Sequence, residues 1–273
     1  MGKAFRLLAV SMMALFVSAC GQGDHETLVI TGSSTLAPLI GDLAADYEAS
    51  NPGVRVDVQS GGSSRGINDV RRGTAAVGMV SRELREEESD LTAYVVARDG
   101  ISLLVHESNP LDALSADQVR RIYYGEIRNW DDVTDFQEPV TVVHKGEGRA
   151  TLAVFLAHFD LDNGKVQPDL VVGENQQAIR SVAGNPGAIG YVSIGAANHE
   201  AERGAPVKGV AIEGVSPDKD AVASGDYPLT RNLNLVSNGP LQGLAKDFVD
   251  YVRSPQAHER IRDHFFTPVA GTR

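Results

Sequence analysis

Three short stretches of the sequence combine small hydroxyl residues with glycine and, in two cases, with basic side chains. They are Ser33-Ser34-Thr35, then Ser63-Ser64-Arg65 between glycines, and the segment from Lys145 to Thr151. Each stretch follows a strand-like run and precedes a helix-like pattern. The start of a helix has free backbone N–H groups and a partial positive charge. Each turn therefore either caps its own helix or binds an anion.

Three such turns in one chain favour a shared anion site over three separate caps. A desolvated oxyanion needs several hydrogen bonds, which one turn cannot supply. Guanidinium groups match tetrahedral oxyanions with two parallel bonds, and Arg65 and Arg149 lie in two of the turns. We therefore expect the side chains of the three turns to converge on one small anion.

The first turn also predicts its own local structure. Residues 28–31 form a strand-like apolar run, and the apolar positions from Leu36 to Tyr47 have helical spacing. Thr35 is expected to cap this helix. Pro38 is then its third residue, where a missing N–H loses no hydrogen bond.

Strands and helices alternate along the rest of the chain, which predicts an α/β fold with mainly parallel sheets. Ser115 and Gln118 have the spacing of a capping box, and the acidic run 86–88 is expected to be a solvated face. Further strands are expected at 54–58, 75–80, 94–98, 101–106, 139–143, 170–172 and 188–192, and further helices at 67–72, 115–124, 152–159, 241–252 and 256–264.

The N-terminus has the features of an export signal. Lys3 and Arg6 precede an apolar run at residues 7–17, which is too short to span a bilayer and is followed by Ser18-Ala19-Cys20. This ending resembles the cleavage box of bacterial lipoproteins. We expect residues 1–19 to be a signal peptide and residues 20–26 a tether lipidated at Cys20. The protein would then be anchored in the periplasm or at the cell surface.

Composition excludes some partners and cofactors. The chain has 25 basic and 36 acidic residues, and loss of Lys3 and Arg6 would move its net charge from −11 to −13. Such a field disfavours nucleic acid, and any anion must be bound by local donors. His258 and His264 are six positions apart, so they cannot share a helix face. Without a zinc motif or a nucleotide P-loop, we expect no metal or cofactor.

An enzymatic alternative comes from the second turn. The segment Gly62–Gly66 matches the G-x-S-x-G nucleophile elbow, in which Ser64 would attack a carbonyl. His258 or His264 and an acid such as Asp220 or Asp226 follow in the required order. The strand expected before the elbow is interrupted by polar residues, and the sequence has no oxyanion loop of the HGG type. A protein that is not an enzyme is therefore favoured.

Five segments in order carry a family resemblance: TGSSTLAPL, SGGSSRGINDVRRGTAAVGMVSREL, GEIRNW, GEGRATLAVF and GNPGAIGYVSIG. Together they resemble the phosphate-binding proteins of bacterial ABC phosphate importers, over about residues 27–269. The resemblance implies a two-lobed periplasmic-binding-protein fold of the two-crossover type. Residues 27–100 and 205–273 would form one lobe, residues 101–204 the other, and the anion would lie between them.

The resemblance also implies a function and partners. The protein would be a monomer that captures inorganic phosphate and delivers it to a membrane permease, touching the membrane only through its lipid. In the first lobe Ser34 and the hydroxyl of Thr35 would bind the anion, together with the N–H of Leu36. Ser64 would donate its hydroxyl and backbone N–H, with Arg65 beside it.

The second lobe departs from the family motif, which is Arg, three residues and then Ser-Gly-Thr. Here Lys145 takes the arginine position, and Arg149, Ala150 and Thr151 follow. We expect Arg149 to make the bidentate contact. Ala150 and Thr151 would donate N–H groups, and Thr151 its hydroxyl.

A second departure concerns selectivity. Well-known family members have an aspartate after the third strand, which accepts the proton of hydrogen phosphate. This chain has Ser81 there, followed by Arg82, and Glu147 in the third turn is the alternative acid that would supply discrimination against sulfate. A hydroxyl does not repel a fully ionised anion, so sulfate or another tetrahedral oxyanion is an alternative ligand. A surface role in sensing or adhesion also stays open.

Overall fold

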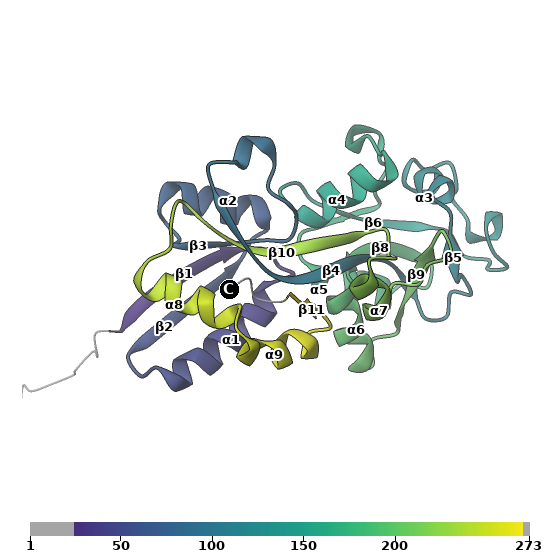
Figure 1. Ribbon diagram of the computed structural model, residues 1–273. Coiled ribbons are helices and arrows are strands. Elements are labelled where there is room, and N and C mark those ends of the chain that lie inside the picture. The colour runs from purple at the N-terminus through teal and green to yellow at the C-terminus, as the bar shows by residue number, and fades with distance from the viewer. Residues whose placement is uncertain (1–24, 270–273) are drawn as a thin grey trace, which may run out of the picture.

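The computed structural model describes residues 25–269, and its elements form two lobes joined by two long strands. The joining strands are β4 (Thr92–His106) and β10 (Thr230–Ser237), which pair antiparallel and run from one lobe into the other (Figure 1). The strand order across the sheet is β2-β1-β3-β10-β4-β8-β6-β7. The expected signal peptide and Cys20 lie outside the described residues.

The first lobe is built on three parallel strands, β1 (Glu26–Gly32), β2 (Val54–Ser60) and β3 (Val77–Val80). Its helices are α1 (Ala37–Ser50), α2 (Ser63–Arg72), α8 (Gly243–Val252) and α9 (His258–Asp263). Helix α1 buries Leu39, Ile40 and Leu43 on one face, which packs in the same core as Phe248 of α8. The apolar period of the sequence thus fixes how α1 lies on the sheet.

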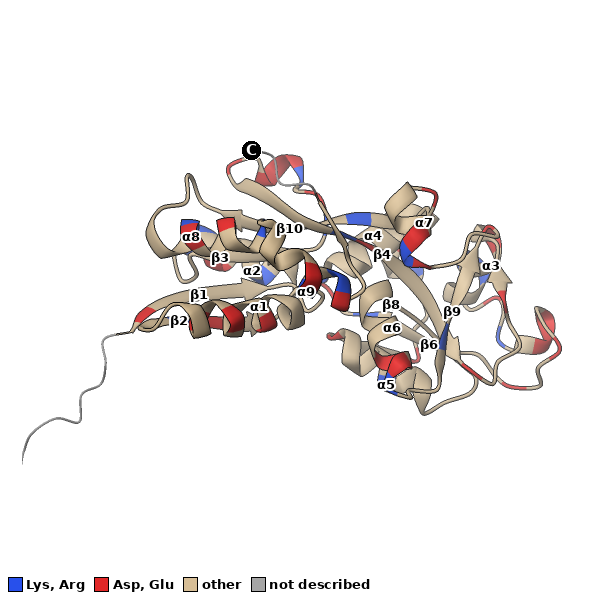
Figure 2. Cartoon of the chain, turned by 60° about the horizontal axis from the view of Figure 1, so that its bottom comes forward, with Lys and Arg blue, Asp and Glu red and all other residues tan. Residues whose placement is uncertain are grey.

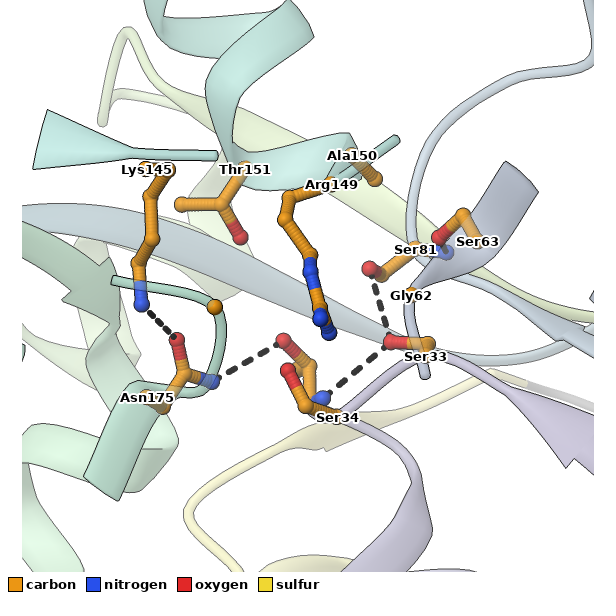
Figure 3. Close-up of a pocket in the computed structure, with 12 residues that line it drawn as sticks. Ser33, Ser34, Gly62, Ser63, Ser81, Lys145, Arg149, Ala150, Thr151 and Asn175 are labelled. Carbon is orange, nitrogen blue, oxygen red and sulfur yellow. Dashed lines mark hydrogen bonds between the residues drawn. The ribbon is translucent and has the colours of Figure 1, made fainter. Parts of the chain in front are cut away.

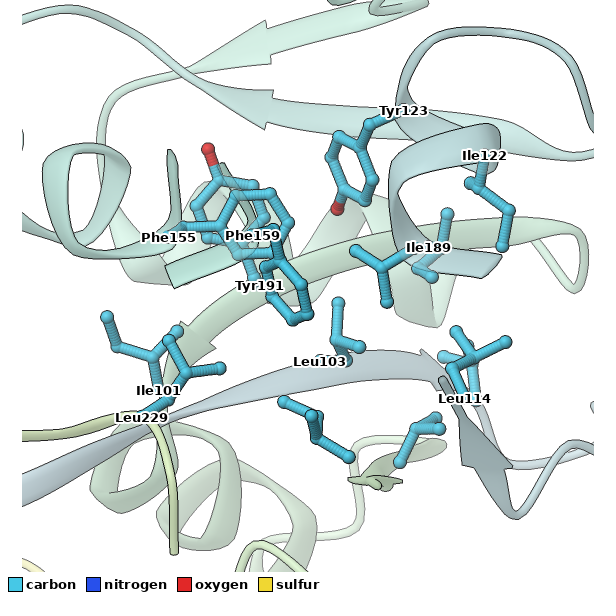
Figure 4. Packing of buried hydrophobic residues seen from close by; sticks show 14 of the residues in the cluster. Ile101, Leu103, Leu114, Ile122, Tyr123, Phe155, Phe159, Ile189, Tyr191 and Leu229 are labelled. Carbon is cyan, nitrogen blue, oxygen red and sulfur yellow. The ribbon is translucent and has the colours of Figure 1, made fainter. Parts of the chain in front are cut away.

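The second lobe contains β8 (Ala188–Ser193), β6 (Thr141–Lys145) and β7 (Leu170–Val172), with β9 (Val207–Ile212) and β5 (Ala113–Leu114) at its edge. Its helices are α3 (Ala116–Tyr123), α4 (Ala150–Phe159), α5 (Asn175–Ala183), α6 (Ile194–Glu202) and α7 (Lys219–Ser224). In its core the rings of Phe155 and Tyr191 stack 3.8 Å apart (Figure 4). Buried Trp130 donates its indole N–H to the Gly187 carbonyl at 2.8 Å.

The expected limits of the lobes need a correction. Residues 205–273 are expected in the first lobe, but β9 pairs with β4 in the second. Val210, Val222 and Tyr227 also belong to the second core. The reason is that β10 pairs only with residues 92–100 of β4, whereas β9 pairs with residues 103–106. This pairing keeps β9 in the second lobe. We propose that the chain returns to the first lobe only at β10.

Other expected elements differ in their limits. Residues 94–98 and 101–106 form one strand, because β4 continues through Asp99 and Gly100 opposite β10. Helix α2 begins at Ser63, four residues before the expected start. No expected element corresponds to α5, α6, α7, β5, β9, β10 or the two-residue β11 (Thr267–Pro268).

Helix α1 has an acidic surface. Figure 2 shows acidic segments on this helix, which carries Asp42, Asp46 and Glu48 without any lysine or arginine. The whole chain has a net charge of −11, so the basic residues of the cavity are set in a predominantly negative protein. Within residues 25–269, no helix is long and apolar enough to cross a membrane.

Candidate anion site

A small cavity lies where the loops before α1, α2, α4 and α5 meet (Figure 3). Its walls come from both lobes and are rich in hydroxyl groups and glycine. They consist of Ser33, Ser34, Thr35, Gly62, Ser63, Ser81, Lys145, Arg149, Ala150, Thr151, Gly173 and Asn175.

The first turn is held by Ser33 and not by Thr35. The Ser33 hydroxyl oxygen accepts the N–H groups of Thr35 (3.1 Å) and Leu36 (3.4 Å) and donates to Ser81 Oγ (2.9 Å). Helix α1 begins at Ala37, so Pro38 is its second residue and not its third. The Thr35 hydroxyl is thereby left to line the cavity.

The second turn approaches the third turn across the cleft. Gly62 has φ +95°, and a Cβ there would lie 2.9 Å from the carbonyl oxygen of Gly148. The N–H of Ser64 donates to that same carbonyl at 3.2 Å. Only glycine allows both the backbone angle and this contact, so Gly62 brings the two loops together.

The third turn places Lys145 in the cavity. Lys145 ends β6, is almost fully buried, and donates from Nζ to the Glu174 carbonyl (2.9 Å) and to Asn175 Oδ1 (3.2 Å). Burial lowers the pKa of Lys145 to about 7, an effect that nearby Glu174 opposes and Arg149 reinforces. Its charge therefore depends on pH near neutrality.

Arg149 reaches over the same cavity from the start of α4 (Figure 3). Its Nη1 lies 2.6 Å from Glu174 Oε1, and this pair uses one of five guanidinium N–H groups. Burial raises the pKa of the Glu174 carboxyl, but bonds from Ser60 and Arg149 outweigh this and hold it below its usual value. The carboxylate keeps Arg149 in place at the cavity wall.

The structure brings most of the expected site residues together. Those that line the cavity are Ser34, Thr35, Ser81, Lys145, Arg149, Ala150 and Thr151. Leu36 and Ser64 do not line it, because their N–H groups bond Ser33 Oγ and the Gly148 carbonyl. The anion contacts expected from these two N–H groups are corrected accordingly.

Arg65 and Arg82 are also directed away from the cavity. Arg65 is exposed and bonds Asp69, Gln59 and the carbonyl of Ser60. Arg82 forms a buried pair with Glu88 at 2.6 Å. The expectation that residues 86–88 are a solvated face is therefore wrong for Glu88.

Asn175 is a cavity residue that the sequence analysis missed. It begins α5, and its Nδ2 donates to Thr35 Oγ1 at 3.2 Å, which joins the two lobes. The missed signal is a fourth strand-to-helix turn, because Glu174 and Gln177 have the spacing of a capping box after β7. Ser33, Gly62 and Ser63 from the first two turns also line the cavity, as does Gly173 before α5.

The donors in the cavity suit an oxyanion better than hydrolysis or metal binding. A hydrolase would need His258 or His264 beside Ser64, but His264 Nε2 lies 2.8 Å from Asp42 and its ring stacks on His199. Across the described part of the chain, no three His, Cys, Asp or Glu residues are grouped to hold a metal ion. The cavity offers hydroxyls, N–H groups and two basic side chains.

Comparison with known proteins agrees with this architecture. Residues 18–256 match the model of the PBP superfamily domain. Phosphate-binding protein PstS of Bacillus subtilis is 28% identical over 98% of this chain and 95% of its own length. The Pseudomonas aeruginosa protein of the same name is 26% identical over 90% and 84%.

Solved structures of substrate-binding proteins also match most of this chain. A putative phosphate ABC transporter substrate-binding protein from Clostridium perfringens, with bound phosphate, has a TM-score of 0.82 and 26% identity, covering 89% of this chain and all of its own. A phosphate transport receptor from Vibrio cholerae has a TM-score of 0.72 and 28% identity, with the same coverage. The expected two-lobed α/β fold is confirmed, and the chain belongs to the PBP superfamily.

Proposed function

We propose that the protein captures inorganic phosphate outside the cytoplasm and delivers it to the permease of an ABC importer. The observation that carries this proposal is one small cavity walled by Thr35 and Ser81 from one lobe and by Lys145, Arg149 and Thr151 from the other. Relatives that match over nearly the whole chain are named as phosphate-binding proteins, which supports phosphate as the ligand.

Binding would proceed by closure of the two lobes. A tetrahedral anion in the cavity touches donors from both sides, so it favours the closed arrangement over the open one. The starts of α2, α4 and α5 add oriented N–H groups. Closure also removes water, which strengthens each charge–dipole interaction with the anion.

The proposal includes an anchor and excludes catalysis. A lipid on Cys20, after removal of residues 1–19, would hold a monomer at the membrane, with residues 20–26 as the tether. The site would release its ligand unchanged, without a cofactor. Loss of phosphate uptake on deletion of the gene would support transport, whereas unchanged uptake would favour a surface role in sensing or adhesion.

Sulfate is the second candidate ligand. Among the described residues that line the cavity none is a carboxylate, and Ser81 holds the position of the family's aspartate. A fully ionised anion would therefore meet donors in the cavity wall, and the nearby carboxylate of Glu174 is paired with Arg149.

Thermal unfolding with each anion tests the assignment. Ligand at 100 times its dissociation constant should stabilise the protein by about 2.7 kcal/mol. A clear shift with phosphate and a smaller one with sulfate would support the proposal. A larger shift with sulfate would favour the second candidate, and no shift with either would refute anion capture.

A further inference from the structure

Arg231 lies on β10 directly opposite Asp99 on β4, where the two joining strands pass between the lobes. Both side chains are buried, with 2% and 0% of their surfaces exposed. Arg231 Nη2 and Nε lie 2.8 Å and 3.2 Å from the same oxygen, Asp99 Oδ2. The carboxylate is itself bonded by the N–H of Gly195 at 3.4 Å, at the start of α6. Arg231 is therefore held firmly in place.

The other hydrogen bonds of Arg231 go to the anion site. Nη1 donates to Thr151 Oγ1 at 3.0 Å and to the Ser81 carbonyl at 3.3 Å. Nη2 donates to Thr35 Oγ1 at 3.1 Å. A guanidinium has five N–H groups, and with the two bonds to Asp99 all five are engaged. Arg231 therefore has no donor left for an anion, and it lies behind the cavity wall.

These bonds determine how the threonine hydroxyls are directed. A hydroxyl oxygen accepts two hydrogen bonds and donates one. Thr35 Oγ1 accepts from both Arg231 and Asn175, so its remaining function is to donate its hydrogen. Thr151 Oγ1 accepts from Arg231 and also lines the cavity. The hydrogens of both hydroxyls are thus available to a ligand in the cavity.

We propose that Arg231 is a positioning residue of the anion site, which turns the hydroxyl hydrogens of Thr35 and Thr151 toward the bound anion. One of these threonines belongs to each lobe, so the guanidinium completes the donor set only when the lobes are closed. This inference rests on the proposed capture of a tetrahedral anion, and it holds equally for phosphate and sulfate. Asp99 offsets the charge of Arg231, so Arg231 acts through geometry.

Lysine at position 231 provides the test, because it keeps the charge but lacks the planar group that spans both threonines and Asp99. By calorimetry with phosphate and with sulfate, we expect Arg231→Lys to weaken binding of the preferred anion about 10- to 100-fold. The matched control is Arg82→Lys. It alters another buried arginine–carboxylate pair whose guanidinium does not line the cavity, so affinity should change less than twofold.

A double-mutant cycle separates positioning from general damage to the fold. In a Thr35→Val, Thr151→Val background, Arg231→Lys should weaken binding less than threefold further, because the hydroxyls it directs are gone. Unchanged affinity in Arg231→Lys alone, or the same loss in both backgrounds, would overturn the inference. A wild-type protein that binds neither anion would instead refute the proposed function.

A measurement on the wild-type protein keeps the inference testable if Arg231→Lys does not fold. In the complex with phosphate, NMR should detect coupling of the ³¹P nucleus to the hydroxyl protons of Thr35 and Thr151. Coupling from backbone amides without coupling from either hydroxyl would overturn the proposal.

Discussion

Replacing Lys145 with arginine should remove the proton uptake that accompanies anion binding above neutral pH. Lys145 is buried against a carbonyl and an amide oxygen, and burial lowers its pKa from 10.5 to about 7. In the empty closed site at pH 8.5 nearly all molecules therefore carry a neutral amine. An anion beside Nζ favours the ammonium form, so binding brings in a proton.

The size of the effect follows from the shift in pKa. A shift of this size corresponds to about 5 kcal/mol between the charged and neutral forms. For a ligand of constant charge, such as sulfate, affinity should fall about 50-fold from pH 7 to pH 9. The reason is that the anion binds the form with protonated Lys145, and the fraction of molecules in that form falls as the pH rises. Below pH 7 Lys145 is already protonated before the anion binds, so its titration should no longer change the affinity with pH.

Stability of the ligand-free protein should change in the opposite direction. The folded-state pKa of Lys145 is depressed, so between pH 7 and 10.5 the unfolded chain binds more protons than the folded chain. Raising the pH through this window therefore stabilises the folded state, by about 2 kcal/mol from pH 7 to pH 9. The gain should be absent in Lys145→Arg, because a guanidinium stays charged over this range.

Calorimetry at pH 8.5 in two buffers of different ionisation enthalpy measures the proton uptake directly. The wild-type protein should take up about one proton more per bound phosphate than Lys145→Arg does. The comparison cancels the titration of phosphate, since both proteins bind the same ion. Equal proton uptake by the two proteins would refute the reasoning, because Lys145 would then not be the group that titrates near neutral pH.

Three further changes have distinct expected outcomes. Arg149→Ala should weaken phosphate binding at least 10-fold in calorimetry, whereas Arg65→Ala, which removes an exposed guanidinium outside the cavity, should change it less than twofold. Trp130→Phe should lower the free energy of unfolding by about 0.5–1.5 kcal/mol in urea titration, because the buried Gly187 carbonyl loses its indole donor but keeps the N–H of Thr141. Gly66→Ala should lower the melting temperature, since its Cβ would lie 2.7 Å from the Thr31 carbonyl oxygen.

The sequence predicted those strands and helices whose apolar residues recur at a regular period. The strand at residues 170–172 and the capping box of Ser115 and Gln118 are present as expected. Strand β10 was missed although its sequence, TRNLNLVS, alternates leucine with polar residues, a pattern typical of a half-buried strand. Arg231 and Asn234 are nevertheless buried there. Arg231 bonds Asp99, and Asn234 Nδ2 donates to the Arg82 carbonyl, while Asn234 Oδ1 is buried without a hydrogen-bond partner among the described residues.

Composition predicted three of the four strand-to-helix turns that line the cavity, but not the turn before α5 and not which cations face the cavity. Arg65 has an acid four residues on and Arg82 has one six residues on, and these local partners hold both guanidinium groups away. An acid at i+4 was visible in the sequence as a competing partner for Arg65. Arg231 had no such signal, because Asp99 is 132 positions away and only strand pairing brings them together.

The pairing of the three basic side chains supports the proposed binding of an anion in this cavity. Arg231 is balanced by Asp99, and Arg149 has Glu174 beside it. Lys145 Nζ instead donates to a carbonyl and an amide oxygen, neither of which carries a full charge. A closed, empty site therefore either releases the lysine proton or leaves a buried positive charge unbalanced, and a bound oxyanion removes both costs. Closure without ligand should accordingly be least favourable at acidic pH, where the proton stays on Lys145.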